Sequence, residues 1–336
     1  MHKADYNRYD NMRYRRSGAS GLLLPELSLG LWQNFGEGAD GKETRSIILK
    51  AFDSGITYFD LANNYGPPGG AAERCFGRIL RDDLMAYRDE IIVSTKAGYE
   101  MWPGPYGNWG SKKYLTASLD QSLKRLGLDY VDIFYHHRPD PQTPLEETAE
   151  ALCQSVRSGK ALYAAVSNYA LKDVMRMQEI MSGYGIHLLV DQVRYNIYDR
   201  EIEKDNLLLG LENIGMGSVI FSPLHQGLLT DKYLLGKIPP GSRGVRSERL
   251  KGIFSNEPAL FDKLDRLNRI ASDRGQPLSS MALCWLLRKE NVTSVLCGAR
   301  TLSQLEDNLK ALSGPREFSK EELDAIDSVF PVAFRR

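Results

Sequence analysis

The chain of 336 residues is long enough to bury a substantial core in one large or two ordinary domains, and its 43 basic and 43 acidic side chains cancel. This balance argues against a nucleic acid or an anionic membrane as a partner. The N-terminus lacks the apolar stretch of a signal peptide, no run is long enough to span a membrane, and the four cysteines are widely spaced. We therefore predict a soluble cytoplasmic protein with reduced thiols and no bound metal.

Short β-prone runs alternate with longer amphipathic runs along the chain. An opening hairpin is expected over Met12–Leu24, with its turn at RSGASG. Eight strands are expected after it, at 26–32, 57–62, 90–98, 130–137, 161–169, 188–196, 217–224 and 292–299. The expected helices lie at 42–55, 71–84, 114–127, 145–159, 171–183 and 205–215, then in the stretch before 292, and last at 301–312 and 319–330.

Strands that alternate with helices favour a parallel sheet. Eight such units, at a length near that of a (β/α)₈ barrel with insertions, favour a closed TIM barrel. The extra length lies in two long loops, Gly98–Ser111 and Gly227–Pro258, and in the C-terminal helix. Because no low-complexity linker interrupts the pattern, we predict one α/β domain over residues 1–336, with the long loops at the C-terminal mouth of the barrel.

The segment Gly36–Gly41 matches the G-x-G-x-x-G pattern of dinucleotide-binding folds, and Asp60 follows about 20 residues later. Two features argue against such a site. Glu37 and Asp40 would place carboxylates against a pyrophosphate. Three residues also separate the strand from the first glycine, where the fingerprint requires an immediate turn. We therefore expect no Rossmann site here.

Polar and aromatic residues stand at the ends of seven consecutive predicted strands. In a barrel these ends converge on one mouth. Taken singly, a buried Lys–Asp pair can be structural and a histidine can be a satisfied core residue, but unpaired charges at a barrel core are costly, so the set favours a functional site. The residues are Trp32, Asp60, Lys96, His137, Ser167, Asn168, Gln192, Phe221 and Ser222.

Tyr65 lies in a loop five residues after Asp60, and this pairing suits proton transfer to a carbonyl oxygen. A phenol is a poor acid or base near neutrality unless a nearby cation favours its ionised form. Lys96 can supply that charge, and Asp60 can hold and balance Lys96. His137 can orient the substrate oxygen. Of the pair His136–His137 only one can face the barrel interior, because neighbouring strand residues point to opposite faces.

Seven segments resemble the signature segments of the aldo-keto reductases: FDLANNYG, STKAG, YVDIFYHHRPD, VSNY, DQVRYN, FSPLHQGLLTDKY and GARTLSQLEDN. They occur in the family's order and span roughly residues 12–312. Within the family, NNYGPPGGAAE and MWPGPYGNWGSKKYL are most similar to the bacterial L-glyceraldehyde-3-phosphate reductases. That branch also resembles the β subunits of voltage-gated potassium channels. The resemblance implies a (β/α)₈ barrel and an NADPH-dependent carbonyl reductase.

The resemblance also implies roles for particular residues. The catalytic residues would be Asp60, Tyr65, Lys96 and His137, with Tyr65 as proton donor. The cofactor NADP(H) would be bound by Trp32, Asp60, Ser167, Asn168, Gln192, Phe221, Ser222, Leu224, Gln226, Gly227, Lys232, Arg300, Gln304 and Asn308. The substrate would contact Trp32, Tyr65, Trp102 and His137.

The resemblance implies that Arg300, Gln304 and Asn308 meet the adenosine 2′-phosphate of the cofactor, and the segment after residue 299 supports this independently. Thr301 and Gln304 form a capping-box pattern at a helix start, which favours an anion, and Arg300 stands beside it. An ordinary capped surface helix would show the same pattern. The chain departs from the family where Leu61 replaces a small hydroxyl residue. His225 and Asp231 likewise replace small residues in the cofactor loop, and Asp231 is unfavourable near a pyrophosphate.

The leading interpretation is reduction of short aldehydes, such as L-glyceraldehyde 3-phosphate or methylglyoxal-like compounds. Bulky residues crowd the expected mouth, although aromatic side chains in loops can also serve packing. Arg138, Lys112 and Lys113 stand where a substrate phosphate could be received, although exposed lysines can simply be solvated. The alternative is a cofactor-bound interaction protein that resembles a channel β subunit with vestigial catalysis. His137 counts against it, because that branch tends to carry Asn there. The sequence is compatible with a homo-oligomer but does not fix the subunit count or the reaction direction.

Overall fold

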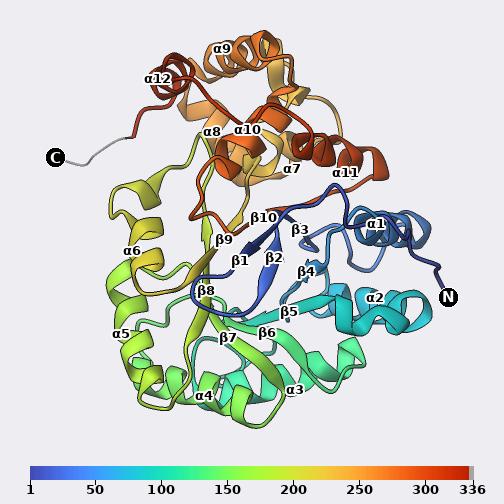
Figure 1. Cartoon of the computed structure of the whole chain (residues 1–336), viewed down its shortest axis with the longest axis vertical. Coiled ribbons are helices and arrows are strands. Elements are labelled where there is room, and N and C mark those ends of the chain that lie inside the picture. Colours follow the sequence, from blue (N-terminus) through green and yellow to red (C-terminus); the bar gives the residue numbers. More distant parts are fainter. Residues whose placement is uncertain (333–336) are drawn as a thin grey trace.

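The computed structural model describes residues 1–332 of the chain. A short hairpin, β1 (Tyr14–Arg16) and β2 (Leu23–Pro25), precedes the main sheet (Figure 1). The sheet contains β3 (Leu27–Gly30), β4 (Tyr58–Asp60), β5 (Ile92–Ala97), β6 (Val131–His136), β7 (Ala161–Ser167), β8 (Leu188–Arg194), β9 (Gly217–Phe221) and β10 (Ser294–Cys297). The α-helices are α1 (Gly41–Asp53), α2 (Ala71–Ile79), α3 (Lys112–Leu126), α4 (Leu145–Arg157), α5 (Leu171–Ser182), α6 (Leu207–Asn213), α7 (Arg243–Arg246), α8 (Glu248–Asn256), α9 (Leu260–Asp273), α10 (Leu278–Leu287), α11 (Leu302–Leu309) and α12 (Lys320–Val329).

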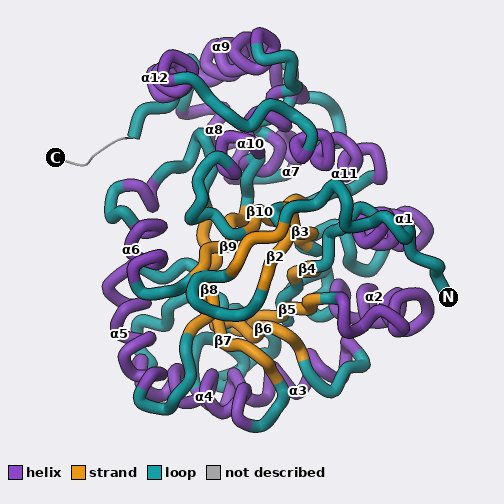
Figure 2. Tube along the Cα trace, in the orientation of Figure 1, coloured by secondary structure: helices purple, strands orange, loops and turns teal. Residues whose placement is uncertain are grey.

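The eight strands β3 to β10 pair in parallel and close into a barrel, because β10 pairs with both β9 and β3. Figure 2 shows the strands as an inner group with the helices around them. The predicted (β/α)₈ barrel, its N-terminal hairpin and its C-terminal helix are therefore confirmed. All six residues of β5 and all six of β6 are buried, as expected for strands that are covered by the barrel interior on one face and by helices on the other.

Two apolar layers hold the barrel together. One fills its interior and includes Tyr58, Ile133, Tyr135 and Val219. Leu24 of the hairpin belongs to this interior layer and is fully buried, so the hairpin closes one end of the barrel. The other, much larger layer lies between the strands and the surrounding helices. The site is therefore built on a framework whose strands are packed on both faces.

The segment Gly36–Gly41 is a loop that leads into α1. The Asp40 side chain caps that helix and accepts hydrogen bonds from the backbone N–H groups of Lys42 and Glu43 at 2.8 and 3.3 Å. Glu37 pairs with Arg74 at 3.0 Å. The helix start that a pyrophosphate would need is thus occupied by a carboxylate, which agrees with the argument against a Rossmann site.

Two segments differ in detail from the predicted elements. The helix expected to reach residue 84 is α-helical only to Ile79 and continues as a π-helical turn over Leu80–Leu84 and a 3₁₀ turn over Met85–Glu90. The second long loop contains the short helices α7 and α8. The Ser247 side chain caps α8 by accepting from the Leu250 N–H. These helices were not predicted because they are short and show no extended hydrophobic period in the sequence.

Candidate active site

Asp60 and Lys96 form an ion pair at the carboxyl ends of two neighbouring strands. Lys96 Nζ lies 2.5 Å from Asp60 Oδ2 and also donates to the Leu61 carbonyl at 2.8 Å. The lysine is completely buried, and Asp60 is 2% exposed. Tyr65 lies next to the pair, with its hydroxyl 3.5 Å from Lys96 Nζ. The structure therefore brings together the three residues that were predicted to act as a unit.

The second oxygen of Asp60 is also fully engaged. Oδ1 accepts from Ser94 Oγ at 2.8 Å, from Gln192 Nε2 at 3.0 Å and from the Tyr58 hydroxyl at 3.3 Å. A buried carboxylate with this many donors is held in one orientation. Asp60 thus fixes the Lys96 ammonium, while Gln192, predicted to contact the cofactor, donates to Asp60 in this structure.

His137 completes the group. Its ring lies edge-on to Tyr65 at a centroid distance of 5.8 Å and edge-on to Tyr99 at 4.7 Å. Burial and the nearby Lys96 hold the pKa of His137 well below its usual value, so the imidazole is neutral. His136 lies on the other face of the strand, where Nδ1 is 2.6 Å from the Tyr169 hydroxyl, so the predicted choice between the two histidines agrees with the geometry.

Burial raises the pKa of Tyr65 well above its usual value, and the charge of Asp60 adds to the effect. The sequence argument expected Lys96 to shift this phenol toward phenolate, but burial dominates here. Burial also lowers the pKa of Lys96, although Asp60 opposes that shift. The phenol is therefore protonated, which is the form that a proton donor requires.

A cavity of about 770 Å³ opens above this group. Every predicted catalytic or cofactor residue except Lys96 lines it, and Lys96 lies beneath Tyr65. Trp102 does not line it, which corrects the predicted substrate contact: its indole packs against Tyr114 at 5.1 Å instead. The predicted residues that line the cavity are Trp32, Asp60, Tyr65, His137, Ser167, Asn168, Gln192, Phe221, Ser222, Leu224, Gln226, Gly227, Lys232, Arg300, Gln304 and Asn308.

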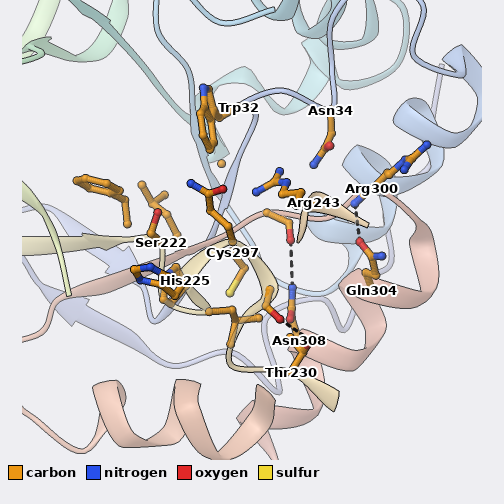
Figure 3. A pocket seen from close by; sticks show the side chains of 18 of the residues that line it. Trp32, Asn34, Ser222, His225, Thr230, Arg243, Cys297, Arg300, Gln304 and Asn308 are labelled. Carbon is orange, nitrogen blue, oxygen red and sulfur yellow. Dashed lines mark hydrogen bonds between the residues drawn. The ribbon is translucent and has the colours of Figure 1, made fainter. Parts of the chain in front are cut away.

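The end of the cavity away from Tyr65 carries cationic and amide side chains. Figure 3 shows Arg243 between Trp32 and the group formed by Arg300, Gln304 and Asn308. The Thr301 hydroxyl caps α11, as predicted, by accepting from the Gln304 N–H at 3.3 Å. The reciprocal half of the capping box is shifted by one residue, because Gln304 Oε1 accepts from the N–H of Arg300 at 2.9 Å.

Residues 26–330 match the family model of the aldo/keto reductases. The chain belongs to the aldo/keto reductase family. Enzymes of this family are oxidoreductases that act on small carbonyl compounds and generally use a nicotinamide cofactor. The chain is 55% identical over 327 residues to the L-glyceraldehyde 3-phosphate reductase of Escherichia coli O157:H7, which covers 96% of this chain and 94% of that protein. It is 35% identical over 324 residues to a probable voltage-gated potassium channel subunit beta of Oryza sativa subsp. japonica, and this alignment covers 95% of this chain and 96% of that protein.

Several lining residues of this aldo/keto reductase were not predicted from the sequence, and Tyr99, Arg194 and Arg243 are among them. Tyr99 follows a strand end by two residues, so its position was a usable signal. Arg194 lies two residues after Gln192 on β8 and therefore on the same strand face, so its position could also have been predicted from the period of two along a strand. Arg243 lies in the second long loop, where no periodic pattern assigns a direction to a side chain.

The basic residues expected to receive a substrate phosphate are engaged elsewhere. Lys112 Nζ pairs with Glu150 at 2.6 Å, and Lys113 Nζ lies 5.2 Å from the centre of the Tyr106 ring. Arg138 donates to the Gly98 carbonyl and to Asn108. None of the three lines the cavity, so that expectation is wrong for this conformation.

The cofactor loop accommodates His225 by burying it. Its Nδ1 is 3.3 Å from Asn196 Nδ2, and its ring packs on Tyr198 at 4.6 Å. Burial lowers the pKa of His225 to about 3, so no charge is added beside the loop. Asp231 lines the cavity. Within residues 1–332 no cluster of three or more His, Cys, Asp or Glu side chains could hold a metal ion, and no helix there is long and apolar enough to cross a membrane.

We expect the protein to lose stability as the pH falls from about 6.5 to about 4, partly because of His136. This ring is fully buried, and burial lowers its pKa to about 4. Below about 6.5 the unfolded chain binds a proton there that the folded chain does not, so the free energy of unfolding falls by up to roughly 1.4 kcal/mol per pH unit for this group. Urea unfolding across this range should show a smaller slope for His136→Gln. The exposed His187→Gln should leave the slope unchanged; equal slopes for wild type and His136→Gln would contradict this account.

Proposed function

We propose that this protein reduces short aldehydes to alcohols with NADPH, and that L-glyceraldehyde 3-phosphate is the preferred kind of substrate. The observation that carries the proposal is the Tyr65 hydroxyl, held 3.5 Å from Lys96 Nζ beside His137 in a large cavity. The relatives named as L-glyceraldehyde 3-phosphate reductases add support.

In the proposed reaction Tyr65 donates the proton that the carbonyl oxygen takes up. The neutral His137 lies on the same wall of the cavity and orients that oxygen by hydrogen bonding. The Lys96 ammonium stabilises the phenolate that Tyr65 becomes, and Asp60 keeps Lys96 in position.

The cavity suits a phosphorylated dinucleotide, which would supply the hydride. Its volume lies within the usual range for cofactor sites. Ser167, Asn168, Gln192 and Phe221 would hold the nicotinamide end. Burial lowers the pKa of Arg243, and no described residue forms an ion pair with its guanidinium, so an anion there would offset the cost of burying this charge.

Arg300 is expected to favour NADPH over NADH. A guanidinium can form paired, charge-assisted hydrogen bonds with a 2′-phosphate, which a ribose hydroxyl cannot match. Arg300→Ala should therefore weaken NADPH binding by roughly 1.5–3 kcal/mol and barely change NADH binding. A fluorescence titration of both cofactors measures this difference. Equal losses for the two cofactors would place Arg300 outside the 2′-phosphate site.

The phosphate of the substrate is assigned to Arg194. Its guanidinium lies 5.4 Å from the centre of the Phe221 ring, and it lines the same cavity as Tyr65 and His137. It shares one carboxylate, Asp199, with Arg249, at 3.6 and 3.3 Å. Two guanidinium groups per carboxylate leave positive charge for an anion at the mouth. Arg194 stands two residues beyond Gln192 on β8, so its backbone lies about 6.6 Å farther along the strand than that of Gln192.

The test compares kcat/KM for glyceraldehyde 3-phosphate, glyceraldehyde and a bulky aromatic ketone. We expect the two short aldehydes to exceed the ketone, because Trp32, Tyr65 and Tyr99 narrow the cavity. The phosphorylated aldehyde should exceed glyceraldehyde, and Arg194→Met should remove that preference without lowering activity on glyceraldehyde. A ketone turned over best would refute the size argument, and indifference to phosphate would remove Arg194 from substrate binding.

A further inference from the structure

Arg138, the residue after His137, holds the first long loop at two points. Its Nε donates to the Gly98 carbonyl at 2.9 Å, and its Nη2 donates to Asn108 Oδ1 at 3.0 Å. These two partners lie near opposite ends of the loop over 98–111. A single guanidinium therefore fixes the separation of the loop's ends.

The same guanidinium lies close to two aromatic rings of the loop. Its carbon is 4.2 Å from the centre of the Tyr99 ring and 3.7 Å from that of Trp109. Trp109 has φ +70°, a left-handed conformation that is unfavourable for a residue with a side chain. Cation–π contact stabilises the ring in this conformation. The planar shape of the Arg138 guanidinium is needed for these contacts. A lysine at this position would offer neither paired donors nor a flat surface for stacking.

The segment that carries Arg138 anchors the end of the loop as well. Asp140 Oδ2 accepts from the Gly110 N–H at 3.0 Å, and the Thr148 hydroxyl donates to the Gly110 carbonyl at 3.0 Å. A side-chain carbon added at Gly110 would lie 2.9 Å from the His136 ring, so only glycine fits against it. The loop is therefore attached to the segment 136–140 and is not free to hinge at this end.

Tyr99 connects this arrangement to the reaction centre. Its ring lies edge-on to His137 at 4.7 Å and also lines the cavity. Tyr65 also lies edge-on to His137, at 5.8 Å. Displacement of Tyr99 would therefore free one face of the imidazole that faces the substrate.

We propose that Arg138 is a positioning residue that clamps the loop over 98–111 and, through Tyr99, holds His137 against the substrate carbonyl. The catalytic part of this inference rests on the proposed function, whereas the clamp does not. The clamp is also distinct from phosphate recognition, because Nε and Nη2 of Arg138 donate within the protein and the residue does not line the cavity.

The test uses the full chain with Arg138→Met and Arg138→Lys, and with Arg81→Met as a matched control, since the Arg81 side chain is 65% exposed. Hydrogen exchange over 98–111 measures release of the loop. In both Arg138 variants we expect faster exchange in this loop, little change in NADPH affinity, and a fall in kcat of roughly 10–100-fold. The fall should be equal for glyceraldehyde and glyceraldehyde 3-phosphate, and lysine should not rescue it.

Unchanged loop exchange in Arg138→Met would overturn the clamp, and a loss confined to the phosphorylated aldehyde would make Arg138 a substrate ligand instead. Tyr99→Leu provides a second variant that keeps the Arg138 hydrogen bonds. It should lower kcat while exchange at Gly98 and Asn108 stays slow, and unchanged kcat would refute the link to His137. If the wild-type protein reduces no aldehyde, the proposed function fails, and the exchange comparison still decides whether the clamp exists.

Discussion

Tyr65→Phe is expected to lower kcat for aldehyde reduction by roughly 10²–10⁴-fold, the usual contribution of a general acid. The substitution removes only the hydroxyl, which lies 3.5 Å from Lys96 Nζ. The ring can keep its edge-on contact with His137. NADPH affinity and the free energy of unfolding should therefore stay close to the wild-type values.

Steady-state kinetics, a cofactor titration and urea unfolding on the same preparation separate these effects. Tyr99→Phe is the matched control, because it removes a phenol hydroxyl from the same cavity. It should leave kcat nearly unchanged. A Tyr65→Phe enzyme within a few-fold of wild type would show that the proton comes from another group.

Lys96→Met is expected to abolish most activity and to destabilise the fold as well. It removes one partner of a fully buried pair and leaves the Asp60 charge without its ammonium. Breaking such a pair typically costs about 3–5 kcal/mol. Ser94, Gln192 and Tyr58 still donate to Asp60, so we expect a loss near the lower end of that range.

The double variant Lys96→Met with Asp60→Asn separates the two effects. Neutralising Asp60 should recover part of the unfolding free energy and none of the activity, because the lysine that stabilises the phenolate is still missing. A modest rise in pH should not restore turnover in either variant. A folded, fully active Lys96→Met protein would refute the proposed role of Lys96.

The barrel was predictable because short β-prone runs alternate regularly with longer amphipathic runs along the chain. Residues such as Asp60, Lys96 and His137 were found because parallel strands bring their carboxyl ends to one mouth, so position along a strand gives position in space. The family resemblance indicated Arg300, Gln304 and Asn308 as proposed cofactor residues, and the cap residues at the helix start supported that proposal independently.

The loops were less predictable, for a physical reason. In a loop the direction of a side chain depends on contacts with distant residues. Trp102 packs on Tyr114 rather than lining the cavity, and Arg138 binds the loop rather than standing free to receive a phosphate. Arg243 reaches the cavity from a loop whose course follows no period. The effect of burial on the pKa of Tyr65 was not predictable either, because the extent of its burial depends on the loops around it.

The most direct test of the account follows deuterium from NADPH labelled at the reactive carbon of its nicotinamide into the product formed from glyceraldehyde 3-phosphate. If the protein transfers hydride, the alcohol carries the label at its new C–H bond, and Tyr65→Phe forms the same labelled product far more slowly. If NADPH binds but no label reaches an alcohol from any short aldehyde, the protein is a cofactor-bound interaction protein, and the proposed reduction is wrong.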